Sequence, residues 1–249
     1  MAFPLTIHLG YGQEKVETSD QKQRLGTRAV LPDGRVFYYA ENSSAAITSG
    51  GQLVDGIAAV GAHDGDLATA ALAAGSLTAT TTTSLTVTKN QYKDGYLFIN
   101  DKVGQGEVYR VKSNTAVASA AGCEITIDES DGIRTALTTS SQFGLMYSPY
   151  KGVKVIDGDG TMTTGTVGVT TIPVTASYYC WLQTSGPAAV FSGAATYVVG
   201  DAVGTSQASG ETGKADLFDS DEDTRPIGTS MGVVSVSTEY GWVMLAIRD

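Results

Sequence analysis

Residues 28–40 read Arg-Ala-Val-Leu-Pro-Asp-Gly-Arg-Val-Phe-Tyr-Tyr-Ala, which places two apolar runs on either side of a turn tripeptide. Within the tripeptide, residues 32–34, proline presets φ for a turn and glycine accepts the positive φ that closes a hairpin. Short runs rich in Val, Phe and Tyr are typical of strands. The sequence therefore predicts one hairpin with strands over 28–31 and 35–40.

Similar segments follow along the rest of the chain. Further strands are predicted over residues 85–88, 96–100, 107–112, 124–127, 143–147, 152–156, 168–172, 178–183, 196–199, 232–236 and 241–247. They are apolar or alternate between apolar and polar residues, and Gly, Asn or Asp bounds them. Short strands at this spacing favour sandwiches or barrels over βαβ units. We therefore expect a mainly β fold with two β-barrel or sandwich-like modules and an extended N-terminal arm.

One helix and two domain boundaries are also predicted. The helix covers Asp66 to Ala74, an alanine-rich stretch that Gly75 would end. Threonine makes up seven of the thirteen residues in 76–88, which is typical of a linker and places a boundary near residue 80. Gly and Thr dominate 157–165 and place the second boundary near 156. The predicted domains are an arm and hairpin region (1–80), a central β module (81–156) and a C-terminal β module (157–249).

The charge balance limits the partners. The 249 residues hold 16 Lys plus Arg against 26 Asp plus Glu, so the formal charge is −10. Phosphate binding needs a clustered excess of Lys and Arg, so nucleic acid and an anionic membrane are not expected as partners. Residues 1–12 lack the basic and apolar regions of a signal peptide, and no apolar stretch approaches the length of a membrane helix. We expect a soluble chain made in the cytoplasm.

Histidine and cysteine are scarce. The chain has two histidines, His8 and His63, so a hydrolase triad or a histidine-rich zinc site would have to use one of them. The two cysteines, Cys123 and Cys180, are not in a CxxC pair. Two free, half-buried thiols are the favoured interpretation, with a single bridge as the alternative.

Two glycine motifs resemble catalytic signatures. Residues 228–232, Gly-Thr-Ser-Met-Gly, match the G-x-S-x-G nucleophile elbow, but a β-rich run follows them and no histidine lies after His63. Residues 104–106, Gly-Gln-Gly, lack the rest of a phosphate loop and are interpreted as a turn. No catalytic residue and no cofactor are predicted.

Acidic loops and aromatic residues leave weaker alternatives. The loops at 219–223, 157–160 and 63–66 each lack a complete calcium ligand set, so they are interpreted as solvated loops and no metal is predicted. A glycosidase would need paired acids on strands beside aromatic platforms. Two aromatic clusters are candidates for binding a sugar face, with burial in the core as the alternative: Tyr178, Tyr179 and Trp181, and Tyr240 with Trp242.

The remaining patterns resemble virion structural proteins of tailed bacteriophages. The segments that carry the resemblance are 25–29, 94–101, 104–113, 125–128, 148–153, 179–188, 227–228 and 238–241. Among such proteins, those of this size and β content are similar to head decoration, or cement, proteins. The resemblance implies a non-enzymatic subunit, often a homotrimer, that binds the major capsid protein on the outer surface of the virion and stabilises the shell.

The N-terminal segment is the predicted shell contact. Residues 13–28 hold four cations against three acids, a net charge of +1 in a chain of −10. The segment has no clear apolar period, which is typical of an arm that orders on docking. The predicted capsid-binding residues are Lys15, Lys22, Arg24 and Arg28.

Two other functions remain open. A phage fibre or surface adhesin that binds host glycans would be favoured by exposed Tyr and Trp clusters and opposed by burial of Tyr178, Trp181 and Trp242. A polysaccharide-active enzyme would need two carboxylates about 5–9 Å apart in a cleft.

Overall fold

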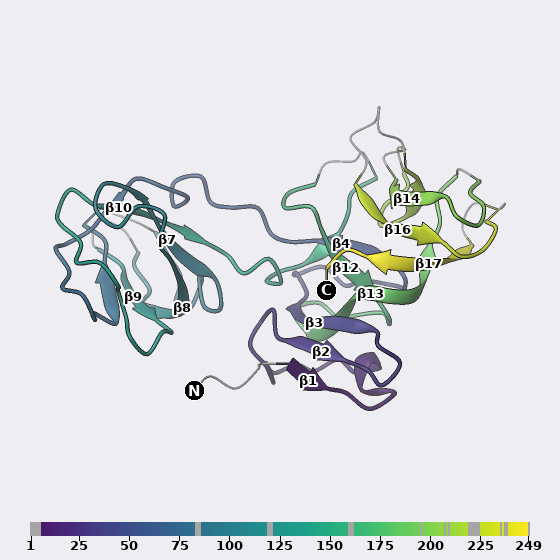
Figure 1. The fold of residues 1–249 in the computed structure, drawn as a ribbon, viewed down its shortest axis with the longest axis horizontal. Coiled ribbons are helices and arrows are strands. Elements are labelled where there is room, and N and C mark those ends of the chain that lie inside the picture. Colours follow the sequence, from purple (N-terminus) through teal and green to yellow (C-terminus); the bar gives the residue numbers. More distant parts are fainter. Residues whose placement is uncertain are drawn as a thin grey trace. The chain divides into compact units, whose positions relative to one another are not determined.

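The computed structural model describes residues 6–82, 86–118, 122–158, 162–194, 196–206, 208, 210–218, 225–234, 236 and 239–248. Residues 1–57 and 149–249 form unit 1, and residues 58–148 form unit 2 (Figure 1). Both units consist of strands, which confirms the predicted mainly β fold; the helical element within the described residues is η1, a 3-10 turn at Gln13–Lys15. No helix in the described part of the chain is long and apolar enough to cross a membrane.

Unit 1 contains one sheet in the order β1-β2-β3-β13-β17-β16-β14-β15, with β12, β4 and β11 branching from β13. Its strands are β1 (Thr6–His8), β2 (Arg28–Val30), β3 (Val36–Glu41), β4 (Leu53–Asp55), β11 (Lys154–Val155), β12 (Thr166–Thr170), β13 (Tyr179–Phe191), β14 (Ala202–Thr205), β15 (Ala215–Leu217), β16 (Pro226–Ser230) and β17 (Tyr240–Ala246). The first part of β13 pairs with β3 and β12, and its second part pairs with β17 (Figure 1). This long strand therefore joins two halves of the sheet.

Each half of unit 1 has its own apolar core. Phe37, Tyr39 and Leu182 are buried in the core beside β3 and the start of β13. Val190 and Val243 belong to the second core, between the end of β13 and the strands that follow it. Burial of such side chains contributes about 1.5–3 kcal/mol each, so β13 stabilises both halves at once.

Unit 2 is an antiparallel sheet in the order β5-β10-β7-β8-β9-β6. Its strands are β5 (Leu67–Ala68), β6 (Thr78–Thr80), β7 (Tyr96–Asp101), β8 (Val108–Asn114), β9 (Glu124–Ile127) and β10 (Gln142–Met146). A bridge between Thr69 and Thr81 connects the two edge strands β5 and β6, so the sheet curls toward closure. Closure removes exposed sheet edges, and this unit matches the barrel-like module expected from the sequence.

The predicted hairpin at residues 28–40 is confirmed, and the predicted helix is wrong. The hairpin of β2 and β3 forms with the predicted turn at residues 32–34. The helix predicted over 66–74 does not form. Leu67 and Thr69 are buried while their neighbours are more exposed, and both pair with other strands, so strand pairing overrides the helix propensity of alanine.

The division of the chain also differs from the prediction. A boundary near residue 80 would fall in β6, where Ala79 is fully buried in the core of unit 2. The threonine-rich segment therefore contains a core strand at residues 78–80. The central unit is instead inserted into the other one, with crossings at 57/58 and 148/149, so the three predicted regions 1–80, 81–156 and 157–249 are replaced by two units.

Within the described residues, the N-terminal segment (6–27) packs against the rest of unit 1 and does not form the predicted extended arm. β1 pairs with β2, Thr18 bridges to Tyr179 at the start of β13, and Leu9 and Leu25 are buried. These contacts could not be predicted from the apolar pattern of the segment, because they use isolated side chains and backbone pairing.

Both cysteines are free and fully buried, Cys123 in unit 2 and Cys180 in unit 1. Burial raises the pKa of Cys180 to about 12, so this group is a thiol at neutral pH. The prediction that both thiols are free is confirmed, but they are fully buried and not half-buried.

Candidate functional site

A hollow of about 370 Å³ opens on unit 1 between η1, β12, β13 and β17. Its volume lies within the range of about 300–1,000 Å³ that is usual for small-molecule sites. Its lining combines two cations, two aromatic side chains and several small residues: Lys15, Arg35, Gly50, Gly51, Val169, Thr170, Thr171, Gln183, Pro187, Ala188, Ala189, Tyr240 and Trp242.

One wall of the hollow is a fixed aromatic ring. The hydroxyl of Tyr240 donates a hydrogen bond of 3.1 Å to the carbonyl oxygen of Gly50. The ring lies so close to Gly51 that a Cβ there would be 2.6 Å from its Cε1 atom, and Gly51 also has a φ of +76°. Glycine is required at this position for both reasons. The side chain of Tyr240 is still half exposed, so it presents a rigid apolar surface.

Trp242 extends this surface along β17. Residues alternate along the strand, and Tyr240, Trp242 and Met244 are exposed while Gly241, Val243 and Leu245 are buried. The partner of Trp242 on β13 is Ala189, whose small side chain leaves the indole 49% exposed. An indole in this position costs hydrophobic free energy unless a ligand or partner covers it. Of the predicted aromatic clusters, Trp181 is buried and Trp242 is not.

Arg35, which also lines the hollow, lies close to two acids. Its Nε atom donates to Asp33 at 2.9 Å, and its Nη2 atom lies 3.9 Å from Oε1 of Glu14. The Glu14 side chain is only 2% exposed, and its other oxygen accepts a 2.6 Å hydrogen bond from the Gly12 amide. Two carboxylates therefore balance the charge of Arg35, as buried charge requires.

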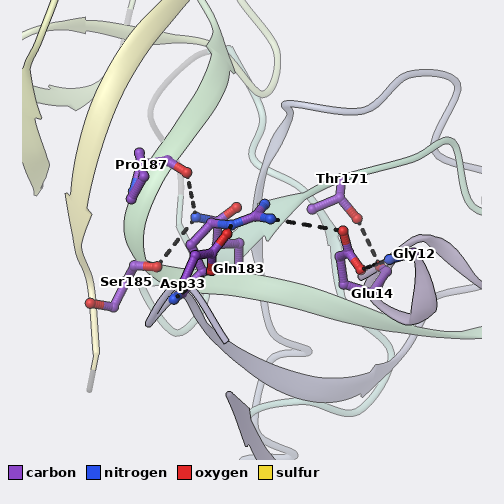
Figure 2. Close-up of polar contacts among 8 residues, drawn as sticks. Gly12, Glu14, Asp33, Thr171, Gln183, Ser185 and Pro187 are labelled. Atoms are coloured by element: carbon purple, nitrogen blue, oxygen red, sulfur yellow. Dashed lines mark hydrogen bonds and ion pairs between the residues drawn. The ribbon is translucent and has the colours of Figure 1, made fainter. Parts of the chain in front are cut away.

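The same network fixes η1 and the floor of the hollow. The Thr171 hydroxyl donates to the Glu14 carbonyl oxygen and ties η1 to the end of β12 (Figure 2). The Nε2 atom of Gln183 donates to the carbonyl oxygens of Ser185 and Pro187. The Oε1 atom of this buried side chain receives no hydrogen bond from the described residues.

The four predicted capsid-binding cations lie in different surroundings. Lys15 is exposed at the end of η1 and lines the hollow. Lys22 and Arg24 are exposed in the turn before β2, where Lys22 pairs with Asp20 at 3.6 Å. Arg28 is half-buried on β2, opposite Tyr38 of β3. The structure thus groups Lys22 with Arg24 on one turn and gives Lys15 a different setting.

A second exposed surface is apolar. Tyr197 bridges to Val234 through a pair of backbone hydrogen bonds, and the Gly200 amide donates to the Ser230 carbonyl oxygen. These bonds hold two loops side by side. The exposed apolar side chains of the two loops, which we call the valine loops, are Val198, Val199, Met231, Val233 and Val236. Val199 and Val233 are 65% and 66% exposed.

The predicted motifs have structural explanations in the described residues. Ser230 of the G-x-S-x-G match is buried at the end of β16, and its hydroxyl donates to the Gly232 carbonyl oxygen at 2.7 Å. Gly104 and Gly106 have positive φ in the turn between β7 and β8, as predicted. Among the described residues there is no group of three His, Cys, Asp or Glu side chains that could hold a metal ion. The loop at 219–223 lies outside the described residues.

Two acids near the C-terminal loops are held within their own unit. Ser206 Oγ donates to Glu211 at 2.6 Å and lies 3.5 Å from Asp216. The Ala194 amide also donates to Glu211, and Lys214 lies 3.8 Å from it. These contacts satisfy the Glu211 carboxylate and favour a structural role for it.

Unit 2 contains one buried histidine. The Nδ1 atom of His63 forms a hydrogen bond with the Tyr92 hydroxyl, and Tyr92 stacks on Tyr147 at a centroid distance of 5.0 Å. Burial lowers the pKa of His63 below its ordinary value, because the charged ring would lose its hydration. The ring is therefore neutral at neutral pH.

We expect unit 2 to lose stability as the pH falls below about 6.5, the ordinary pKa of histidine. The unfolded chain takes up a proton there while the folded chain resists it, so the contribution is complete above this pH and is lost below it. Thermal unfolding followed by circular dichroism at pH 7 and pH 5 should show the melting temperature fall by several degrees more for the wild-type chain than for His63→Gln. Equal falls in the two proteins would contradict this assignment.

No family model matches the chain, and neither a curated protein nor a solved structure is significantly similar to it.

The sequence indicated Tyr240, Trp242 and Lys15 as candidate residues but not their proximity to Arg35 and Gln183. The adjacent glycines at 50 and 51 were the local signal that the backbone is closely approached there.

Proposed function

We propose that this chain is a non-enzymatic bacteriophage capsid decoration protein that binds the major capsid protein on the outer shell surface and associates with copies of itself. The valine loops are the observation that carries the proposal. Exposed apolar clusters of this kind are uncommon on monomers and mark interfaces with other proteins. A decoration protein needs such surfaces, because many modest contacts around one particle add up to strong attachment.

The valine loops fit self-association better than shell binding. Five apolar side chains lie on two loops that are held together by backbone hydrogen bonds. Interfaces between identical subunits are more apolar than other interfaces. A homotrimer centred on these loops would cover them.

The exposed cations of the N-terminal segment suit a contact with the capsid shell. Glu14 is buried against Arg35, so the outer charge of residues 13–28 is four cations against two acids, Glu17 and Asp20. Lys22, Arg24 and Arg28 are therefore retained as the proposed capsid-binding residues, in a chain whose net charge is −10. Complementary charge at such a surface favours correct orientation and fast association more than raw affinity.

Charge placed on the valine loops is expected to abolish self-association. In Val199→Asp/Val233→Asp, the carboxylates would be desolvated in the interface without partners, and we expect the trimer to dissociate to monomers at micromolar concentration. Analytical ultracentrifugation of both proteins measures the effect. The control is Val103→Asp/Val108→Asp, which changes two exposed valines of unit 2. A monomeric wild-type chain would remove the homotrimer from the proposal.

Shell decoration itself is tested by copy number. Quantitative mass spectrometry of purified virions should give a ratio near one to one between this chain and the major capsid protein. A ratio of a few per hundred would assign the chain to a tail, vertex or fibre, and absence from the virion would overturn the proposal.

The adhesin alternative has one observation in its favour. Trp242 and Tyr240 are exposed beside the hollow, whereas Trp181 is buried. Exposed aromatic rings beside polar groups are what recognition of a sugar ring requires.

A further inference from the structure

We propose that the hollow on unit 1 binds an acidic sugar, a pyranose ring that bears a carboxylate, within a glycan chain. The proposal rests on three features of the hollow: two exposed aromatic side chains, the amide oxygen of Gln183, which receives no hydrogen bond from the described residues, and one lysine without an ion pair among the described residues. It names the site and the ligand class for the adhesin alternative and does not depend on shell decoration.

The aromatic side chains would stack on the apolar face of the ring. Tyr240 is fixed over Gly50 and Gly51 by its hydrogen bond, and Trp242 lies two residues further along the same side of β17. Rigid rings lose little conformational entropy when a ligand binds. A sugar ring has C–H groups on one face and hydroxyls around its edge, so it can cover the indole and still present donors to its surroundings.

Polar groups in the lining match those donors. Gln183 is 2% exposed, its Nε2 atom is committed to two backbone carbonyls, and its Oε1 atom receives no hydrogen bond from the described residues. This oxygen can therefore accept a hydrogen bond from a hydroxyl group of a ligand. The Thr171 hydroxyl donates to Glu14 and keeps lone pairs with which it can accept a second hydrogen bond.

Lys15 selects for a negative charge. Arg35 also lines the hollow, but Glu14 and Asp33 neutralise it. Lys15 has no such partner among the described residues, so its charge is available to a ligand in the hollow. A chain with a formal charge of −10 repels anions in general, and a local cation is needed to hold an acidic ligand. A neutral sugar would gain nothing from this lysine.

The test uses the full chain on an array of uronic-acid and sialic-acid oligosaccharides, each printed beside its carboxyl-reduced form. We expect binding to members of the acidic set and weaker binding to the reduced partners. Trp242→Ala should weaken binding to both forms by about tenfold, since ring stacking is lost. Lys15→Ala should lower binding of the acidic form to the level of the reduced form.

Matched controls separate the site from general effects. Tyr96→Ala removes an exposed aromatic ring of unit 2, and Lys22→Ala removes another exposed lysine of the N-terminal segment. Neither should change glycan binding. The proposal is overturned if no acidic glycan binds, if the acidic and reduced forms bind equally, or if Trp242→Ala binds as the wild-type chain does. Sedimentation of Trp242→Ala and Lys15→Ala with virion shells is scored separately, so that loss of glycan binding and loss of decoration are distinguished.

Discussion

Gly228→Ala is expected to unfold much of unit 1 and to lower its free energy of unfolding by about 3 kcal/mol or more. Gly228 lies in β16, opposite Leu245 of β17. A Cβ at this position would overlap the backbone carbonyl oxygen of Met244 and lie 3.0 Å from the Cα of Leu245. Backbone atoms cannot rotate away, and β17 is held on its other side by β13. The pairing of β16 with β17 would therefore have to open.

The matched control lies in the same motif. A Cβ at Gly232 would meet only the Cβ of Trp242, at 3.8 Å, which is ordinary van der Waals contact. Gly232→Ala should therefore change the free energy of unfolding by less than about 0.5 kcal/mol. Urea unfolding followed by tryptophan fluorescence measures both variants. Equal stability of Gly228→Ala and the wild-type chain would show that the two strands can separate without cost.

This pair of variants also explains why the G-x-S-x-G match occurs. Gly228 allows two strands to approach, and Ser230 turns its hydroxyl onto the backbone of Gly232. Packing accounts for the first glycine and the serine without catalysis. A motif of this length gains meaning only from its structural context, as the β-rich sequence after it indicated.

Strands with a strong local pattern could be predicted from the sequence. β7, β8, β9, β10 and β17 all lie where alternation or apolar runs placed them. Short strands such as β4, β14 and β15 were missed, because runs of 3 or 4 residues are too short to show a periodic pattern. The pairing of these strands with distant partners defines them.

The domain arrangement could not be predicted for a related reason. The chain passes between the units at 57/58 and 148/149, where the composition does not change. The composition does change in the threonine-rich stretch, but that stretch contains a core strand. Residues 57 and 149 lie 92 positions apart along the chain but belong to the same unit, because unit 2 is inserted between them. Only long-range contacts reveal it.

One part of the candidate site could be deduced from the sequence, and another part could not. Alternation along β17 places Val243 and Leu245 on one side and Tyr240 and Trp242 on the other, so exposure of Trp242 could have been deduced. The hollow could not, because Glu14 and Gln183 come from segments far apart in the sequence and meet through the sheet topology.

Arg35→Met is expected to lower the free energy of unfolding of unit 1 by about 3 kcal/mol. The variant keeps an apolar stem beside Phe37 but leaves the Glu14 carboxylate 2% exposed with the Gly12 amide as its remaining charge-stabilising partner. An uncompensated buried charge costs several kcal/mol. The 3.9 Å separation and the 20% exposure of Arg35 place the expected loss at the lower end of that range.

Two further variants isolate the cause. Glu14→Gln/Arg35→Met should recover most of the lost stability, because a neutral amide can still accept the hydrogen bond from Gly12 and leaves no buried charge. Asp33→Asn removes only the more exposed partner of Arg35 and should cost less than about 1 kcal/mol. Urea unfolding of the three variants gives the coupling between Glu14 and Arg35. If the double variant is as unstable as Arg35→Met, the loss comes from packing of the arginine stem, and Arg35 does not compensate the charge of Glu14.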